Sequence, residues 1–412
     1  MMDKAKWKVV ANLGYSIGAV VLFNVVLQFV VYPFLSAQVG EEEFGIIIYL
    51  LSIITILSNS AGIALNYTRV VIHRQLETKN GDYNTFLLGF GGVAVIVCCI
   101  ILYFSGRLTV LDALLFSMLT ILTAVRWYAD VEFKMSLRYS LYFLFYVILS
   151  AGNVLGLLVF KGTGNWYLAI MLGEILALLF SVFRKKLFCR PVFSLSQNHR
   201  VVWRKASALT VSYAISNVIM NIDRLLLMNL ISGTAVSIFY KASLFGKTLA
   251  MVIGPLNGVI IAYLAQYDGH LSKKNYLKIV FGVIAISTVA FFGCILVAPY
   301  VLQFLYPEVF DEVNRILSLA TVGQIAFFAS NLLLVIVLRF CHEKYQLYIE
   351  VFCGILYVAL AVPATLWYGI DGFAVATLIA NVIKFIVVCV VGVTHMGGPT
   401  LIKSSDVEEG AQ

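Results

Sequence analysis

Residues 85–104 read TFLLGFGGVAVIVCCIILYF, twenty residues without one charged side chain. A helix needs roughly 20 apolar residues to cross the hydrocarbon core of a bilayer, whereas a spanning β-strand needs about ten residues that alternate in polarity. This run is continuous rather than alternating. It therefore predicts a membrane-spanning helix.

Similar runs recur along the whole chain. Of its 412 residues, 61% are hydrophobic and 12% are charged, and the mean hydropathy is +0.95. A soluble domain carries about 25% charged residues, so this composition excludes soluble enzymes, secreted disulfide scaffolds and disordered chains. We predict an all-α integral membrane protein with about twelve transmembrane helices, at roughly 12–36, 43–65, 85–104, 108–127, 140–160, 165–183, 207–231, 236–265, 278–298, 315–338, 345–368 and 372–395.

The basic residues predict the orientation of these helices. Most of the 29 Lys and Arg residues fall in connections that share one side of the membrane when the N-terminus is cytoplasmic. Cytoplasmic loops are enriched in Lys and Arg. We therefore expect both termini in the cytoplasm, and we assign the net charge of +8 to a face beside anionic lipid rather than to nucleic-acid binding.

The most polar connection, residues 184–206, divides the chain into two halves of six helices. We predict an N-terminal lobe at 1–195 and a C-terminal lobe at 196–412 that ends in a short cytoplasmic tail. The halves resemble each other weakly, with Gly40 and Gly233 in corresponding places. Parallel repeats of this kind are a transporter pattern in which the substrate site lies between the halves.

Signals for enzyme chemistry are missing from the sequence. The seven cysteines lack the paired spacing of a metal or redox site, and we expect neither disulfides nor a bound metal. The sequence contains no Gly-rich phosphate loop, no His-Glu-x-x-His and no Gly-x-Ser-x-Gly motif. We therefore expect a protein that is not an enzyme and that needs no cofactor.

Ionisable residues within the expected spans are the candidate site residues, because such groups are costly in a bilayer and usually functional. At 1.5 Å per residue, Glu174, Lys247 and Lys384 lie near mid-membrane. Asp223, Arg224 and Lys241 lie nearer the outer edge, and Glu350 lies nearer the inner edge.

Four of these seven residues are basic, and a basic interior suits an anion such as a phosphate or diphosphate. We predict substrate binding by Arg224, Lys241, Lys247 and Lys384, and ion coupling by Glu174 and Asp223. A purely structural role remains open, in which Glu174 forms an ion pair with Lys247 or Lys384, and Asp223 neutralises Arg224. The first half has no basic residue deep in an expected span.

Four stretches in order along the chain carry a resemblance to a known family. They are VGEEEFG at 39–45, NIDRLLLMNLISG at 221–233, LYPEVF at 305–310 and YGIDGFAVA at 368–376. The set resembles the polysaccharide transporter family, which holds the Wzx-type flippases of O-antigen and capsule repeat units and shares a superfamily with multidrug exporters. The family's usual Gly-x-Tyr-x-x-Ala reads Ser237-Ile-Phe239-Tyr-Lys-Ala242 in this chain.

The resemblance implies a two-lobed, MATE-like, V-shaped exporter fold of twelve helices with a cationic central cavity. It implies transfer of undecaprenyl-diphosphate-linked oligosaccharide across the bacterial inner membrane, coupled to an ion gradient, with a polysaccharide polymerase as a candidate partner. Arg224, Lys247 and Lys384 are then expected to contact the diphosphate from the cavity, with Lys241 at its outer rim.

Two other functions compete with this one. A multidrug or cation exporter needs a lone membrane carboxylate, and only Glu174 is placed for that role. A membrane-bound acyl- or glycosyltransferase needs a loop with catalytic His or Asp residues. The longest loop, 184–206, is instead strongly basic.

Overall fold

The computed structural model describes residues 2–73, 75–184, 187–188, 192–248, 271–340 and 344–395. Within these residues the chain is helical and contains no strand, and helical residues occur at each of the twelve expected spans. The far part of the expected span 236–265, with Tyr263 and Gln266, lies outside the described residues. The all-α membrane fold is therefore confirmed.

The contacts between helices divide the chain into two units, Met1–Leu225 and Leu226–Gln412. The first unit contains α1 (Met2–Val26), η1 (Leu27–Val31), α2 (Tyr32–Val39), α3 (Glu41–Ile72), α4 (Asn80–Phe104), α5 (Val110–Ala129), α6 (Val131–Met135), α7 (Tyr139–Thr163), α8 (Trp166–Phe183) and α9 (His199–Met220). The helix α10 (Ile222–Leu230) crosses the division. The second unit contains helical residues 233–248, α12 (Lys273–Leu305), η2 (Pro307–Val309), α13 (Phe310–Phe340) and α14 (Lys344–His395).

This division falls later in the chain than the lobe boundary expected at 195/196. The reason is that α9 packs extensively along α3 and also touches α4, which assigns α9 to the first unit. The division into two six-helix lobes stays a prediction.

Two interruptions of the helices have clear local causes. A π-helical turn, η1, ends two residues before Pro33, which lacks a backbone N–H and whose ring crowds the preceding turn of a helix. In α14, Gly369 has φ 59° and ψ −141°, a conformation that favours glycine, and it separates the two expected spans 345–368 and 372–395.

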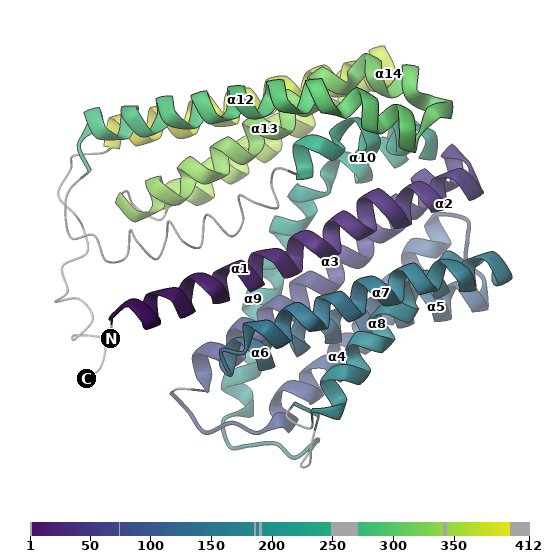
Figure 1. Ribbon diagram of the computed structural model, residues 1–412, viewed down its shortest axis with the longest axis vertical. Helices are drawn as coiled ribbons and strands as arrows, with labels where there is room; N and C mark the ends of the chain where they lie inside the picture. Colours follow the sequence, from purple (N-terminus) through teal and green to yellow (C-terminus); the bar gives the residue numbers. More distant parts are fainter. Residues whose placement is uncertain are drawn as a thin grey trace. The chain divides into compact units, whose positions relative to one another are not determined.

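In the first unit, α3 is the central helix and packs against α5 and α9, while α7 and α8 lie side by side (Figure 1). Glycines allow the close approach of α7 and α8. A Cβ added at Gly156 would lie 1.8 Å from the carbonyl oxygen of Ala169, and one at Gly152 would lie 2.6 Å from the Cα of Gly173. The two backbones are therefore in direct contact.

In the second unit, α12, α13 and α14 surround one apolar cluster. Tyr276 of α12 is fully buried in this cluster beside Leu333 of α13 and Val388 of α14. Its hydroxyl donates a 3.2 Å hydrogen bond to the carbonyl of Val388. The Tyr276 hydroxyl thus has its hydrogen-bond partner within the protein, as a lipid environment requires.

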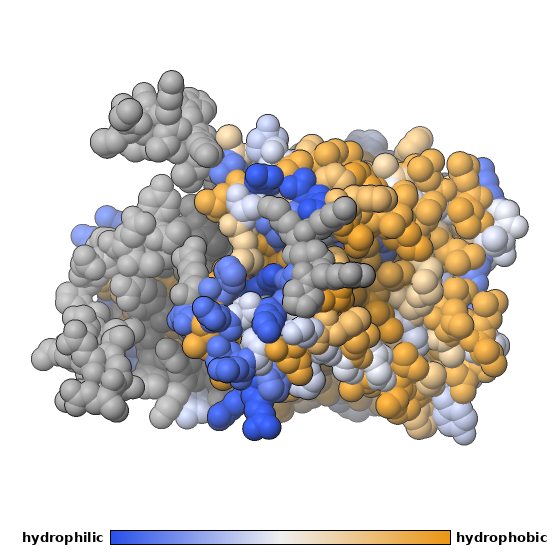
Figure 2. All heavy atoms as spheres, turned by 90° about the horizontal axis from the view of Figure 1, so that it is seen from below, coloured by the Kyte–Doolittle hydropathy of each residue, from blue (hydrophilic) through white to orange (hydrophobic). Residues whose placement is uncertain are grey.

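Nine helices in the described residues are long and apolar enough to cross a membrane, one of them being the interrupted α14. Large apolar side chains also remain exposed on the surface, as Figure 2 shows for the face seen from below. Exposed aromatic residues occur where helices end, with Phe104 at the end of α4 and Phe304 at the end of α12. This pattern is typical of lipid-facing helices with aromatic ends at the interface, and the chain is a multi-pass membrane protein.

Candidate functional site

Glu174 of α8 is buried and ion-paired within the first unit. Its Oε2 accepts a 2.7 Å hydrogen bond from Nε of Arg126, and its Oε1 accepts one of 3.3 Å from Thr123. The side chains of Arg126 and Glu174 are 3% and 4% exposed. The partner of Glu174 is thus Arg126 of α5, and not the Lys247 or Lys384 considered from the sequence.

The buried Arg126 is a basic residue that was not among the candidates expected from the sequence. It lies near the end of the expected span 108–127, and α5 continues to Ala129. The Arg126 guanidinium lies 4.7 Å from the ring centroid of Trp127. The i, i+3 spacing of Thr123 and Arg126 on one helical face was the available signal.

A second ion pair of the first unit is exposed and lies near the start of α3. Arg107, between α4 and α5, donates hydrogen bonds of 2.7 and 2.6 Å to the two carboxylate oxygens of Glu43 on α3. These hydrogen bonds raise the pKa of Arg107 above its usual value. Arg107 therefore stays charged at any physiological pH.

Arg224 and Asp223 lie at the start of α10, after a break between α9 and α10 at Asn221. Nη1 of Arg224 donates a 3.0 Å hydrogen bond to Oδ1 of Asn221, and Nδ2 of Asn221 donates to the carbonyl of Asn217 at 2.8 Å. Asp223 is buried. Arg224 thus belongs to a polar cluster with asparagines, and its role in substrate binding stays a prediction.

Lys241 is fully buried in the second unit. Its Nζ lies 4.4 Å from the ring centroid of Tyr306, the residue that separates α12 from η2. An ammonium over an aromatic face is a cation–π contact, which partly replaces the lost hydration. Lys247, six residues further along, is half-buried. Neither placement tests whether these lysines bind a substrate.

Lys384 of α14 is buried and bound to a carboxylate in the same unit. Its Nζ lies 3.0 and 3.1 Å from the two carboxylate oxygens of Glu350 and donates a 3.1 Å hydrogen bond to Oδ1 of Asn331. Lys384 was expected near mid-membrane and Glu350 nearer the inner edge, so the depth expected from the sequence did not predict the pair. The long lysine side chain spans the difference.

Asp82, at the start of α4, holds the connection 184–206 against the first unit through hydrogen bonds. Its Oδ1 accepts a 2.7 Å hydrogen bond from the backbone N–H of Ser196, and its Oδ2 accepts one of 2.7 Å from the Ser196 hydroxyl. Trp203 donates to the Asp82 carbonyl at 2.9 Å. A buried carboxylate therefore anchors this connection.

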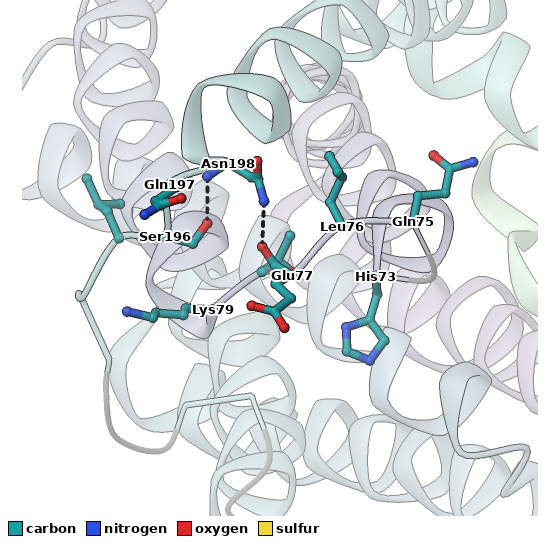
Figure 3. Close-up of a pocket in the computed structure, with 10 residues that line it drawn as sticks. His73, Gln75, Leu76, Glu77, Lys79, Ser196, Gln197 and Asn198 are labelled. Carbon is teal, nitrogen blue, oxygen red and sulfur yellow. Dashed lines mark hydrogen bonds between the residues drawn. The ribbon is translucent and has the colours of Figure 1, made fainter. Parts of the chain in front are cut away.

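A polar cavity of about 770 Å³ lies beside this anchor. Figure 3 shows Ser196 and Asn198 on one side of it and Glu77 and Lys79 on the other. The Asn198 side chain crosses to donate a 3.0 Å hydrogen bond to the Glu77 carbonyl. The residues that line the cavity include both an acidic and a basic side chain, and most of them are exposed. The lining therefore does not favour one class of ligand.

The described residues contain no group of three or more His, Cys, Asp or Glu residues that could hold a metal ion.

Comparison with solved structures identifies the fold. An inward-facing multidrug resistance transporter of the MATE family, in the MOP superfamily, superposes with a TM-score of 0.68 at 12% identity and covers 94% of this chain and 96% of its own. A MATE transporter in the bent conformation gives 0.62 at 14% identity, with 98% and 97% coverage. The lipid II flippase MurJ, in an inward closed conformation, gives 0.64 at 14% identity, with 92% and 86% coverage.

No protein-family model matches the chain, and no curated protein sequence matches it. The three similar structures are two transporters and a flippase. The expectation of a MATE-like fold is confirmed. The chain has the exporter fold that MATE transporters and the MurJ flippase share.

Proposed function

We propose that this chain is a flippase that moves undecaprenyl-diphosphate-linked oligosaccharide repeat units from the cytoplasmic to the outer leaflet of a bacterial inner membrane. In this role it supplies O-antigen, capsule or exopolysaccharide synthesis, with a polysaccharide polymerase as a downstream partner. Both termini lie in the cytoplasm. The four resembling sequence stretches and the fold shared with a lipid II flippase support this proposal.

One observation favours an anionic cargo over a cationic one. The glutamates Glu174 and Glu350 are each bound to a cation, Arg126 and Lys384 respectively. A cation exporter needs a carboxylate that is available to its cationic cargo, whereas each of these two carboxylates is bound to a cation of its own unit. Buried lysines such as Lys241 and Lys384 instead suit a phosphate-bearing cargo.

The residue roles follow from this proposal. Arg224, Lys241, Lys247 and Lys384 bind the diphosphate, and Glu174 or Asp223 couples transport to an ion gradient. A multidrug exporter is the second candidate, since MATE transporters share the fold. The two candidates differ in the phenotype of a deletion.

Deletion of the gene in its host tests the proposal. We expect lipid-linked repeat units to accumulate on the cytoplasmic face while surface glycan disappears. Complementation with Lys247→Ala or Lys384→Ala should not restore the glycan, whereas Lys384→Arg should restore part of it, because a guanidinium also binds phosphate. Each variant is compared at equal abundance in the membrane. An unchanged surface glycan with altered drug resistance would favour the multidrug exporter.

A further inference from the structure

Two helices of the first unit, α3 and α9, carry uncharged polar side chains along their contact. The helices lie side by side (Figure 1). Nδ2 of Asn217 on α9 donates a 3.3 Å hydrogen bond to the hydroxyl of Ser60 on α3. Tyr67 follows Ser60 by two helical turns on the same face of α3, and it is near enough to Tyr213 of α9 to interact electrostatically. We call Tyr67, Tyr213, Ser216 and Asn217 the α3–α9 strip.

The side chains of the α3–α9 strip are accessible to a ligand. Tyr67 is 50% exposed, Ser216 is exposed, and Tyr213 and Asn217 are half-buried. Nδ2 of Asn217 is held by Ser60 and by the carbonyl of Tyr213. Among the described residues, Oδ1 of Asn217 and the two tyrosine hydroxyls have no hydrogen-bond partner. These three groups are therefore available to hydrogen-bond a ligand.

The α3–α9 strip reaches a depth at which such groups do not face hydrocarbon. Asn217 lies about ten residues into the expected span 207–231, which is roughly 15 Å into a core about 30 Å thick. The helix α9 is 22 residues long, yet it is not among the nine described helices that are apolar enough to cross a membrane. Polar groups without partners are costly in lipid, so this face of α9 borders water.

The chemistry of the α3–α9 strip suits a neutral sugar. The strip carries no charge, so it offers no counter-charge to an organic cation or to a phosphate. A sugar ring has an apolar C–H face and a polar edge of hydroxyls. A tyrosine ring offers a flat apolar surface with a polar tip, and amide and hydroxyl groups can both donate to and accept from sugar hydroxyls.

We propose that the α3–α9 strip binds sugar rings of the cargo, with Tyr67 and Tyr213 as stacking surfaces and Ser216 and Asn217 as hydrogen-bonding groups. This inference rests on the proposed function, in which the cargo is an oligosaccharide linked to a diphosphate lipid. It separates recognition of the glycan from recognition of the diphosphate, and the resemblance assigns none of these four residues.

The test compares two lipids on the purified full-length chain in neutral detergent. One is the undecaprenyl-diphosphate-linked repeat unit extracted from the host, and the other is undecaprenyl diphosphate without sugar. The wild-type chain should bind the sugar-bearing lipid about tenfold more tightly. Tyr67→Ala and Tyr213→Ala should each lose most of this difference and keep the affinity for undecaprenyl diphosphate, which shows that they are folded. Tyr213→Phe keeps the ring and should retain most of the difference.

Tyr103→Ala is the matched control. Tyr103 is 67% exposed near the end of α4, in the same unit, where its ring packs against Phe104. The substitution removes the same side chain from the surface and should leave the difference between the two lipids unchanged. A loss in Tyr103→Ala as large as that in Tyr67→Ala would overturn the inference, because removal of any exposed tyrosine would then explain it.

The remaining outcomes separate this inference from the proposed function. Equal affinity of the wild-type chain for the two lipids, or an unchanged difference in both alanine variants, would overturn the sugar site while binding of undecaprenyl diphosphate still supports the flippase. Failure of the wild-type chain to bind either lipid would overturn the proposed function itself. Binding of the organic cation tetraphenylphosphonium in place of both lipids, weakened by Tyr213→Ala, would assign the strip to a multidrug exporter.

Discussion

At the scale of single residues, an ion pair between arginine and glutamate contributes differently to stability when it is buried and when it is exposed. Arg126 and Glu174 are almost fully buried, whereas Arg107 and Glu43 are 39% and 37% exposed. Breaking a buried pair leaves an uncompensated charge, at a cost of about 3–5 kcal/mol, whereas an exposed pair contributes about 0–1 kcal/mol. These two ion pairs, both in the first unit, therefore form a matched comparison.

We predict that Glu174→Gln strongly lowers the midpoint of thermal unfolding in detergent, because Arg126 keeps its charge without its partner. The double variant Arg126→Met/Glu174→Met should recover most of the loss, since apolar residues of similar volume replace a buried pair at little cost. Glu43→Gln is the control and should shift the midpoint only slightly. If Glu174→Gln and Glu43→Gln lower the unfolding midpoint equally, then Glu174 does not form a buried ion pair with Arg126.

The sequence identified Glu174 and Lys384 as unusual, but not their partners. Both lie within uninterrupted apolar runs, where a single charge is conspicuous. Arg126 lies three residues before the end of α5, where a span and a loop cannot be told apart by composition. Pairing depends on how helices rotate against each other, and a single sequence does not encode that angle in a readable pattern.

At the scale of helices, the contact between α7 and α8 depends on positions that have no room for a side chain. Gly156 lies against the carbonyl of Ala169, whereas a Cβ at Gly162, in the same helix, would meet nothing within 4 Å. The hydrophobic effect does not hold helices together in lipid, so their association depends on close van der Waals packing. Small residues at the contact allow this close approach. The packing of α7 on α8 should therefore be sensitive to one methyl group.

We predict that Gly156→Ala lowers stability by about 1–3 kcal/mol, the usual cost of overpacking a tight contact. Gly162→Ala should be neutral or slightly stabilising, because alanine favours helix over glycine. Thermal unfolding of both variants in the same detergent checks the difference. A Gly156→Ala variant as stable as Gly162→Ala would mean that α7 and α8 are further apart than their backbones indicate.

At the scale of the whole molecule, the sequence predicted the helices well because membrane spans are long and uniformly apolar. The described ends differ from the expected ones mainly by polar turns beyond the apolar runs, as in α3, which extends to Ile72 rather than to residue 65. The halves were expected to divide at the most polar connection. Ser196 of that connection is tied to Asp82 of the first unit, a contact between segments that sequence patterns do not reveal.

The orientation of the chain can be tested with single cysteines placed in a variant that lacks the seven native ones. Gln197→Cys and Lys273→Cys should react with a membrane-impermeant label only from the cytoplasmic side, and Thr163→Cys only from outside, because the basic connections face the cytoplasm. All three native side chains are exposed, and Gln197 spares Ser196, which bonds to Asp82. Labelling of Gln197→Cys from outside would reverse the proposed orientation.

The most direct test of the flippase is lipid translocation by the purified chain in sealed proteoliposomes. A fluorescent undecaprenyl-diphosphate-linked oligosaccharide is placed in both leaflets, and a membrane-impermeant quencher reports how fast the inner pool becomes accessible. We predict rapid exchange with the wild-type chain, and with Lys384→Ala exchange no faster than in protein-free liposomes. Wild-type proteoliposomes that move the lipid no faster than protein-free ones, with or without an ion gradient, would contradict the account.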